Sequence, residues 1–157
     1  MQRLPPAVSQ TSADFWASFL PKSNRQTGFS LRRPTRRSVV QFERVGFRFR
    51  YHLEYDAPDA TVEFALRRSD GEQIYTGLVR RREQIDAAFG GPLRWLREAR
   101  SATDPWPYPA LRWTAPCPPL RDLDRSQWPA LQAQMIDAMV RLERAVVPHV
   151  QQWLAAD

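Results

Sequence analysis

The chain has 157 residues, of which 43% are hydrophobic and 25% are charged, and its formal net charge at pH 7 is +6. This composition excludes a disordered or collagen-like chain and is sufficient for one domain, residues 1–157, with its own hydrophobic core. A single cysteine excludes an intramolecular disulfide, and two widely separated histidines give no ligand spacing for zinc, so we expect no metal and no cofactor.

The first predicted helix covers residues 13–20, where aromatic side chains recur at helical spacing. Ser12 can act as its N-cap, and Pro21 is expected to end it. Residues 1–12 are expected to be flexible. They show no signal-peptide pattern, and no window of the sequence is apolar enough for a membrane span, so we expect a cytoplasmic protein with no membrane partner.

A strongly basic segment follows this helix. Residues 22–50 contain nine basic side chains and one acidic side chain, a local net charge of +8, whereas the rest of the chain has a net charge of −2. We interpret residues 22–38 as a basic arm. Four arginines surround a single proline in its centre: Arg32, Arg33, Arg36 and Arg37.

Three strands are predicted next, in "SVVQFER", "FRFRYHLEY" and "TVEFALRR". Within residues 47–55, aromatic and aliphatic side chains alternate strictly with polar ones, which is typical of a strand with one buried face. We expect an antiparallel meander whose outer face is wet and mostly basic. Three arginines and one histidine are expected on that face: Arg48, Arg50, His52 and Arg67.

The spacing of apolar residues then changes to that of a helix, which is predicted over residues 70–89. Asp70 is expected to be its N-cap, and Gly90 is expected to end it in the left-handed backbone conformation. Two strands, "PLRWLREA" and "ALRWTAP", are joined by the loop "RSATDPWPYP". A long helix over residues 126–155, capped by Asp124 or Ser126, ends the chain. The predicted fold is α+β: one domain with a five-stranded, mainly antiparallel sheet, helices on one face and a long C-terminal helix.

This order of elements resembles the bacterial domain-of-unknown-function family numbered 4268. The resemblance rests on "TVEFAL", "RREQIDAAFGGPLRW" and "WPALQAQMIDAMVRLERAVVPHV" and extends over residues 14–153. The family domain often follows a restriction-endonuclease-like module, which implies work on nucleic acid by association. We find no such module in these 157 residues, so the resemblance does not imply nuclease chemistry for this chain.

The sequence contains only weak signals of an enzyme active site. A metal-dependent nuclease needs clustered carboxylates, and Glu54 with Asp56 is a poor substitute. His52 and His149 are not paired by any sequence feature, and Cys117 has no recognisable neighbouring base. We therefore expect no catalytic residues.

The arginines are the strongest functional signal, because guanidinium groups bind phosphates bidentately and stack on bases. Trp106 and Tyr108 lie in a proline-flanked aromatic loop and are predicted to contact a partner. We expect a non-catalytic accessory module of a bacterial nucleic-acid-targeting system, for example a defence system. Its partner would be DNA, RNA or a larger effector protein such as a nuclease. The alternative is a protein-interaction adaptor or homodimer that recognises an acidic protein surface.

Overall fold

The computed structural model describes residues 6–27, 38–101 and 104–155. The helices and strands of these residues are α1 (Pro6–Thr27), β1 (Val39–Arg44), β2 (Phe47–Leu53), β3 (Ala60–Ala65), α2 (Gly71–Val79), α3 (Arg82–Phe89), β4 (Arg94–Ser101), β5 (Asp104–Ala115) and α4 (Trp128–Ala155). Two short 3₁₀ turns, Leu120–Asp122 and Arg125–Gln127, precede α4. No helix in these ranges has both the length and the apolar character that crossing a membrane requires.

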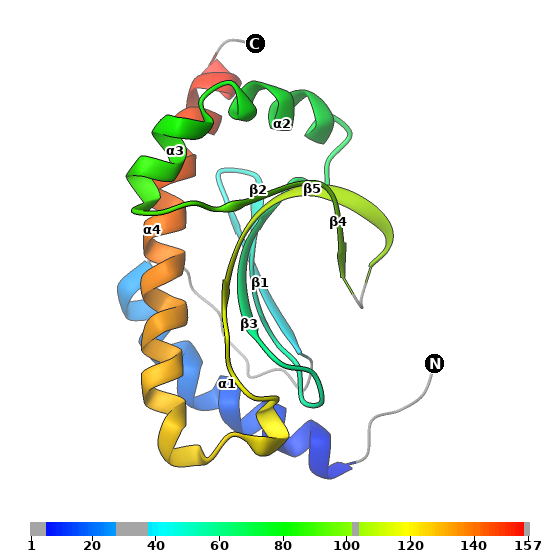
Figure 1. Ribbon diagram of the computed structural model, residues 1–157, viewed down its shortest axis with the longest axis vertical. Helices are drawn as coiled ribbons and strands as arrows, with labels where there is room; N and C mark the ends of the chain where they lie inside the picture. The colour runs from blue at the N-terminus through cyan, green and yellow to red at the C-terminus, as the bar shows by residue number, and fades with distance from the viewer. Residues whose placement is uncertain (1–5, 28–37, 102–103, 156–157) are drawn as a thin grey trace.

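The five strands form one sheet in the order β1-β2-β3-β5-β4, and each neighbouring pair is antiparallel. Helices α1 and α4 pack on one face of this sheet, while α2 and α3 lie across its end beside the C-terminal part of α4 (Figure 1). The predicted α+β fold, with a five-stranded antiparallel sheet and a long C-terminal helix, is confirmed.

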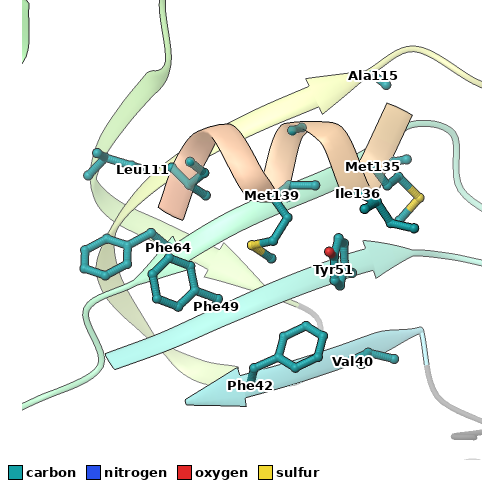
Figure 2. Close-up of a cluster of buried hydrophobic side chains, with 14 of the residues drawn as sticks. Val40, Phe42, Phe49, Tyr51, Phe64, Leu111, Ala115, Met135, Ile136 and Met139 are labelled. Atoms are coloured by element: carbon teal, nitrogen blue, oxygen red, sulfur yellow. The ribbon is translucent and has the colours of Figure 1, made fainter. Parts of the chain in front are cut away.

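The core lies between the sheet and the two long helices. Alternate residues of β2 point into it, and the Tyr51 ring meets the rings of Phe19 and Phe42 at centroid distances of 4.6 and 5.5 Å. Figure 2 shows Met135 and Met139 of α4 beside the aromatic side chains of the sheet. The apolar side of α4 is thus buried on its own sheet, and this burial is the main stabilising term of the fold.

Helix α1 is longer than predicted. It continues through Pro21 to Thr27, and Ser12 is a buried residue inside it, so the expected cap and stop are both wrong. Tertiary contacts on both sides of the proline hold the helix together, because Phe19 packs on the sheet and Ser23 shares a 3.2 Å hydrogen bond with Tyr51. Residues 6–12, which were expected to be flexible, belong to this helix.

The helix predicted over residues 70–89 is divided into α2 and α3 at Arg80 and Arg81. Because of this break, α2 contacts β5 while α3 packs along α4. The apolar faces of the two helices therefore pack on different elements. Asp70 makes no capping hydrogen bond, because both of its carboxylate oxygens accept hydrogen bonds from Arg68. Gly90 has φ of +95° at the end of α3, as predicted.

The remaining boundaries differ in three places. Residues 22–27 of the predicted basic arm belong to α1, and residues 28–37 lie outside the described residues. The predicted loop 100–109 belongs mostly to β4 and β5, since β5 begins at Asp104. The C-terminal helix begins at Trp128, directly after a 3₁₀ turn whose capping box is formed by Asp124 and Gln127.

Candidate nucleic-acid interface

The face of the sheet turned away from α1 and α4, here called the outer face, carries a row of polar residues, most of them charged. The strand register aligns five residues across the sheet: Gln41, Arg50, Glu63, Arg112 and Arg94. Glu63 therefore lies directly between two arginines that come from strands on either side of it. Opposite charges at directly paired positions attract each other across the short distance between strands.

The β4–β5 hairpin curls over the outer face (Figure 1). A second, small cluster fills this curl: Ala65, Ala99, Tyr108 and Ala110, with Leu96 packed against it. The alanine side chains let the curled strands approach the rest of the sheet closely. As a result, Glu63 has no exposed surface, although the long helices α1 and α4 pack on the opposite face of the sheet.

Arg112 and Tyr108 hold the buried carboxylate. Arg112 Nε donates a 2.8 Å hydrogen bond to Glu63 Oε2, and Arg112 Nη2 donates a second to the same oxygen. The Tyr108 hydroxyl donates a 2.9 Å hydrogen bond to Glu63 Oε1. The Arg112 side chain is 16% exposed, so most of this ion pair is shielded from water.

Two further basic groups face Glu63 Oε1 at longer distances. Arg50 Nη1 lies 3.9 Å and His52 Nε2 lies 3.7 Å from this oxygen. Both distances are too long for hydrogen bonds, so any effect of these two groups on Glu63 is electrostatic. We refer to Glu63, Arg112, Tyr108, Arg50 and His52 as the Glu63 network.

The network keeps Glu63 ionised. Burial favours the neutral acid, but His52 and Arg112 outweigh this effect and hold the pKa of Glu63 at about 2. We assign the larger share to Arg112, because its two nitrogens bond the carboxylate directly. Burial, reinforced by the neighbouring Glu63 charge, raises the pKa of Tyr108 to about 12, so Tyr108 remains a hydrogen-bond donor at neutral pH.

A small cleft of about 210 Å³ opens beside this network, between the β2–β3 connection and Arg100 and Ser101 of β4. His52, Thr61 and Arg112 line it together with the acidic Glu54 and Asp59. The lining has both signs of charge and suits a polar group better than a simple anion. In the described part of the chain, no three His, Cys, Asp or Glu side chains are grouped to hold a metal ion.

The predicted binding residues lie in different environments. Arg48 and His52 are half-buried on the outer face, and Arg67 is half-buried with its guanidinium 5.9 Å from the centre of the Tyr108 ring. The expectation of a wet face is wrong at its centre, because Arg50 is only 2% exposed. The reason is the curl of β4 and β5, which no local sequence pattern indicates.

The two predicted contact aromatics are separated by the same curl. Trp106 is 73% exposed, but Tyr108 is buried in the Glu63 network and is not available as a contact residue. Figure 1 shows the hairpin that carries both residues. The four arm arginines lie outside the described residues: Arg32, Arg33, Arg36 and Arg37.

Glu63 and Arg112 were not predicted as site residues. The signal for Glu63 was a charged residue between Val62 and Phe64 in a mostly apolar strand. Arg112 lies 49 residues further along the chain, and only the pairing of β3 with β5 brings the two together.

A family model described as "Domain of unknown function (DUF4268)" matches residues 11–150. The chain belongs to this family. The match extends from α1 to α4 and includes all five strands, so the Glu63 network lies within the DUF4268 domain. No curated protein and no solved structure matches this DUF4268 chain.

Proposed function

We propose that this DUF4268 protein binds nucleic acid, or an effector protein already bound to nucleic acid, as a non-catalytic accessory module in the bacterial cytoplasm. A nucleic-acid-targeting system such as a defence system would use such a module. The observation that supports this proposal is the concentration of positive charge in one stretch of the sequence. Residues 22–50, which include β1 and the start of β2, have a local net charge of +8.

The geometry of the outer face fits this role. The Ser38 carbonyl accepts a 2.9 Å backbone hydrogen bond from the Leu53 amide, so Ser38, which follows the four arm arginines in the sequence, lies beside the C-terminal end of β2. Neither Arg48 nor Arg94 forms an ion pair with another described residue. Both guanidinium groups can therefore neutralise phosphates, whereas Arg112 is already held by Glu63.

The salt dependence of binding tests this proposal. Fluorescence anisotropy is measured with labelled duplex DNA in rising salt, for the wild type and for a variant with Arg32, Arg33, Arg36 and Arg37 changed to alanine. Each lost phosphate contact lowers the slope of log affinity against log salt by about 0.9, so four contacts give a slope shallower by roughly three to four.

A matched control removes the same charge elsewhere. It changes four exposed arginines outside the sheet to alanine: Arg80, Arg82, Arg121 and Arg144. The control should keep a slope close to that of the wild type. An unchanged slope in the arm variant, or equal losses in both variants, would refute a specific role of the arm.

One observation favours the alternative, a protein-interaction adaptor. A groove of about 270 Å³ lies between α2 and the end of α4, where Trp153 packs over Gly77. The Arg81 guanidinium donates a hydrogen bond to Gln152 at its rim. Measuring the mass of the particle in solution, with and without nucleic acid, separates self-association from nucleic-acid binding.

A further inference from the structure

Trp106 is unusual among the large hydrophobic residues of this protein because its side chain is exposed to solvent. At 73% exposure it is the most exposed large hydrophobic residue in the described part of the chain. It is the third residue of β5, and the start of this strand lies at the tip of the curled β4–β5 hairpin (Figure 1). Prolines precede and follow it in the sequence, and their fixed φ angles restrict the backbone that carries the indole.

The surroundings of Trp106 are not those of a protein-binding hot spot. Such aromatics lie in the apolar centre of an interface and are ringed by other contact residues. Among the described residues, the other exposed large hydrophobics are Val45 in the β1–β2 turn, Val79 at the end of α2 and Leu154 near the end of α4. None of them belongs to β4 or β5, so among the described residues this hairpin presents no other exposed large hydrophobic side chain.

Arginines are the neighbours of this stretch of β5 instead. Two residues beyond Trp106, the Tyr108 ring is flanked by the guanidinium groups of Arg50 at 5.4 Å and Arg67 at 5.9 Å. Arg50 is buried and Arg112 is held by Glu63, so neither is available to a phosphate. The more accessible arginines of this stretch are Arg67 and the exposed Arg100 of β4, which lies between the residues that pair with Tyr108 and Asp104. An exposed aromatic side chain beside accessible arginines is the composition of surfaces that bind single strands, where bases stack on the ring and cations hold the phosphates.

We propose that Trp106 is a base-stacking platform and that the nucleic acid bound by this protein is single-stranded. This inference rests on the proposed function, and it adds the class of ligand. In a duplex, each base face is already covered by the neighbouring bases, so an indole has no face to stack on. An unpaired base offers that face, and stacking tolerates any base.

A comparison of oligonucleotides tests the inference without altering the protein. Fluorescence anisotropy is measured with a thymidine oligonucleotide and with an abasic oligonucleotide of the same length, which has the same phosphates and no bases. The wild type should bind the thymidine oligonucleotide about ten- to a hundredfold more tightly, the range expected for stacking of one base. It should also bind this oligonucleotide more tightly than the corresponding duplex.

Variants then assign the effect to one residue. Trp106→Ala should lose most of the preference for the thymidine oligonucleotide while its affinity for the abasic one is unchanged, and Trp106→Phe should retain most of the preference. Leu154→Ala, which shortens an exposed apolar side chain on α4, is the matched control and should behave as the wild type does.

The outcomes separate this inference from the proposed function. If no nucleic acid binds, the proposed function fails. If the wild type binds both oligonucleotides equally, or if Trp106→Ala leaves the preference intact, the stacking inference is overturned while phosphate binding remains. Equal losses on both oligonucleotides in Trp106→Ala would also overturn it, because stacking cannot act on a strand without bases.

Discussion

Replacing Glu63 with glutamine should destabilise this protein strongly at neutral pH. The substitution keeps the size of the side chain, removes its charge and replaces one of its two acceptor oxygens with an amide group that donates hydrogen bonds. Arg112, which donates two hydrogen bonds to Glu63 Oε2, would lose its counter-charge, and Arg50 would remain 2% exposed beside a neutral group. Removing one partner of a buried ion pair leaves an uncompensated charge in a region of low dielectric.

The size of the effect can be worked out in two ways. Lowering the pKa of a carboxyl group from 4.5 to about 2 corresponds to about 3 kcal/mol of folding free energy at neutral pH. Mutations that break one side of a buried ion pair cost about 3–5 kcal/mol. We therefore expect Glu63→Gln to lower the free energy of unfolding by about 3 kcal/mol at pH 7.

The effect should depend on pH in a defined direction. The pKa of Glu63 is lower in the folded state than in the unfolded state, so its stabilising contribution is fully present above about pH 4.5. The contribution is lost as the pH falls towards 2, where the wild-type carboxyl is itself neutral. The difference between the wild type and Glu63→Gln should therefore become smaller between pH 4.5 and pH 2.

Urea denaturation of both proteins across this pH range measures the difference. The matched control is Glu72→Gln, because Glu72 forms a 2.8 Å ion pair with Arg97 in which both side chains are more than half exposed. That change should cost at most about 1 kcal/mol. A Glu63→Gln effect as small as that of the control, or one that does not change with pH, would refute our account of the Glu63 network.

Two smaller predictions concern neighbouring features. Tyr108→Phe removes the hydroxyl that donates to Glu63 Oε1 and should cost about 1.5–3 kcal/mol in urea denaturation, as for hydrogen bonds to charged groups; an unchanged midpoint would contradict this role. Gly71→Ala should destabilise by about 1–3 kcal/mol, because its Cβ would lie 2.3 Å from the backbone oxygen of Leu66. Gly91→Ala, whose Cβ would meet nothing within 4 Å, is the control, and equal effects of the two changes would disprove the steric explanation.

Much of the fold follows from local patterns in the sequence. The alternation in residues 47–53 determined β2 and its buried aromatic face, because side chains of a strand point to opposite sides in turn. Gly90 determined the end of α3, since a positive φ is easily adopted only without a Cβ, and Asp124 determined the start of the last helical region. These features depend on residues close together in the chain.

The tertiary structure decided the features that depend on distant residues. Pro21 does not end α1, because contacts with the sheet outweigh the loss of one helical hydrogen bond. The helix predicted over residues 70–89 breaks because its two parts pack on different elements. The burial of Glu63 beside Arg112 depends on strand register and on the curl of β4 and β5, which are set by packing across the whole sheet. The sequence alone therefore determined the strands and the basic segment, and the fold decided that Arg50 is held inside while Trp106 remains exposed.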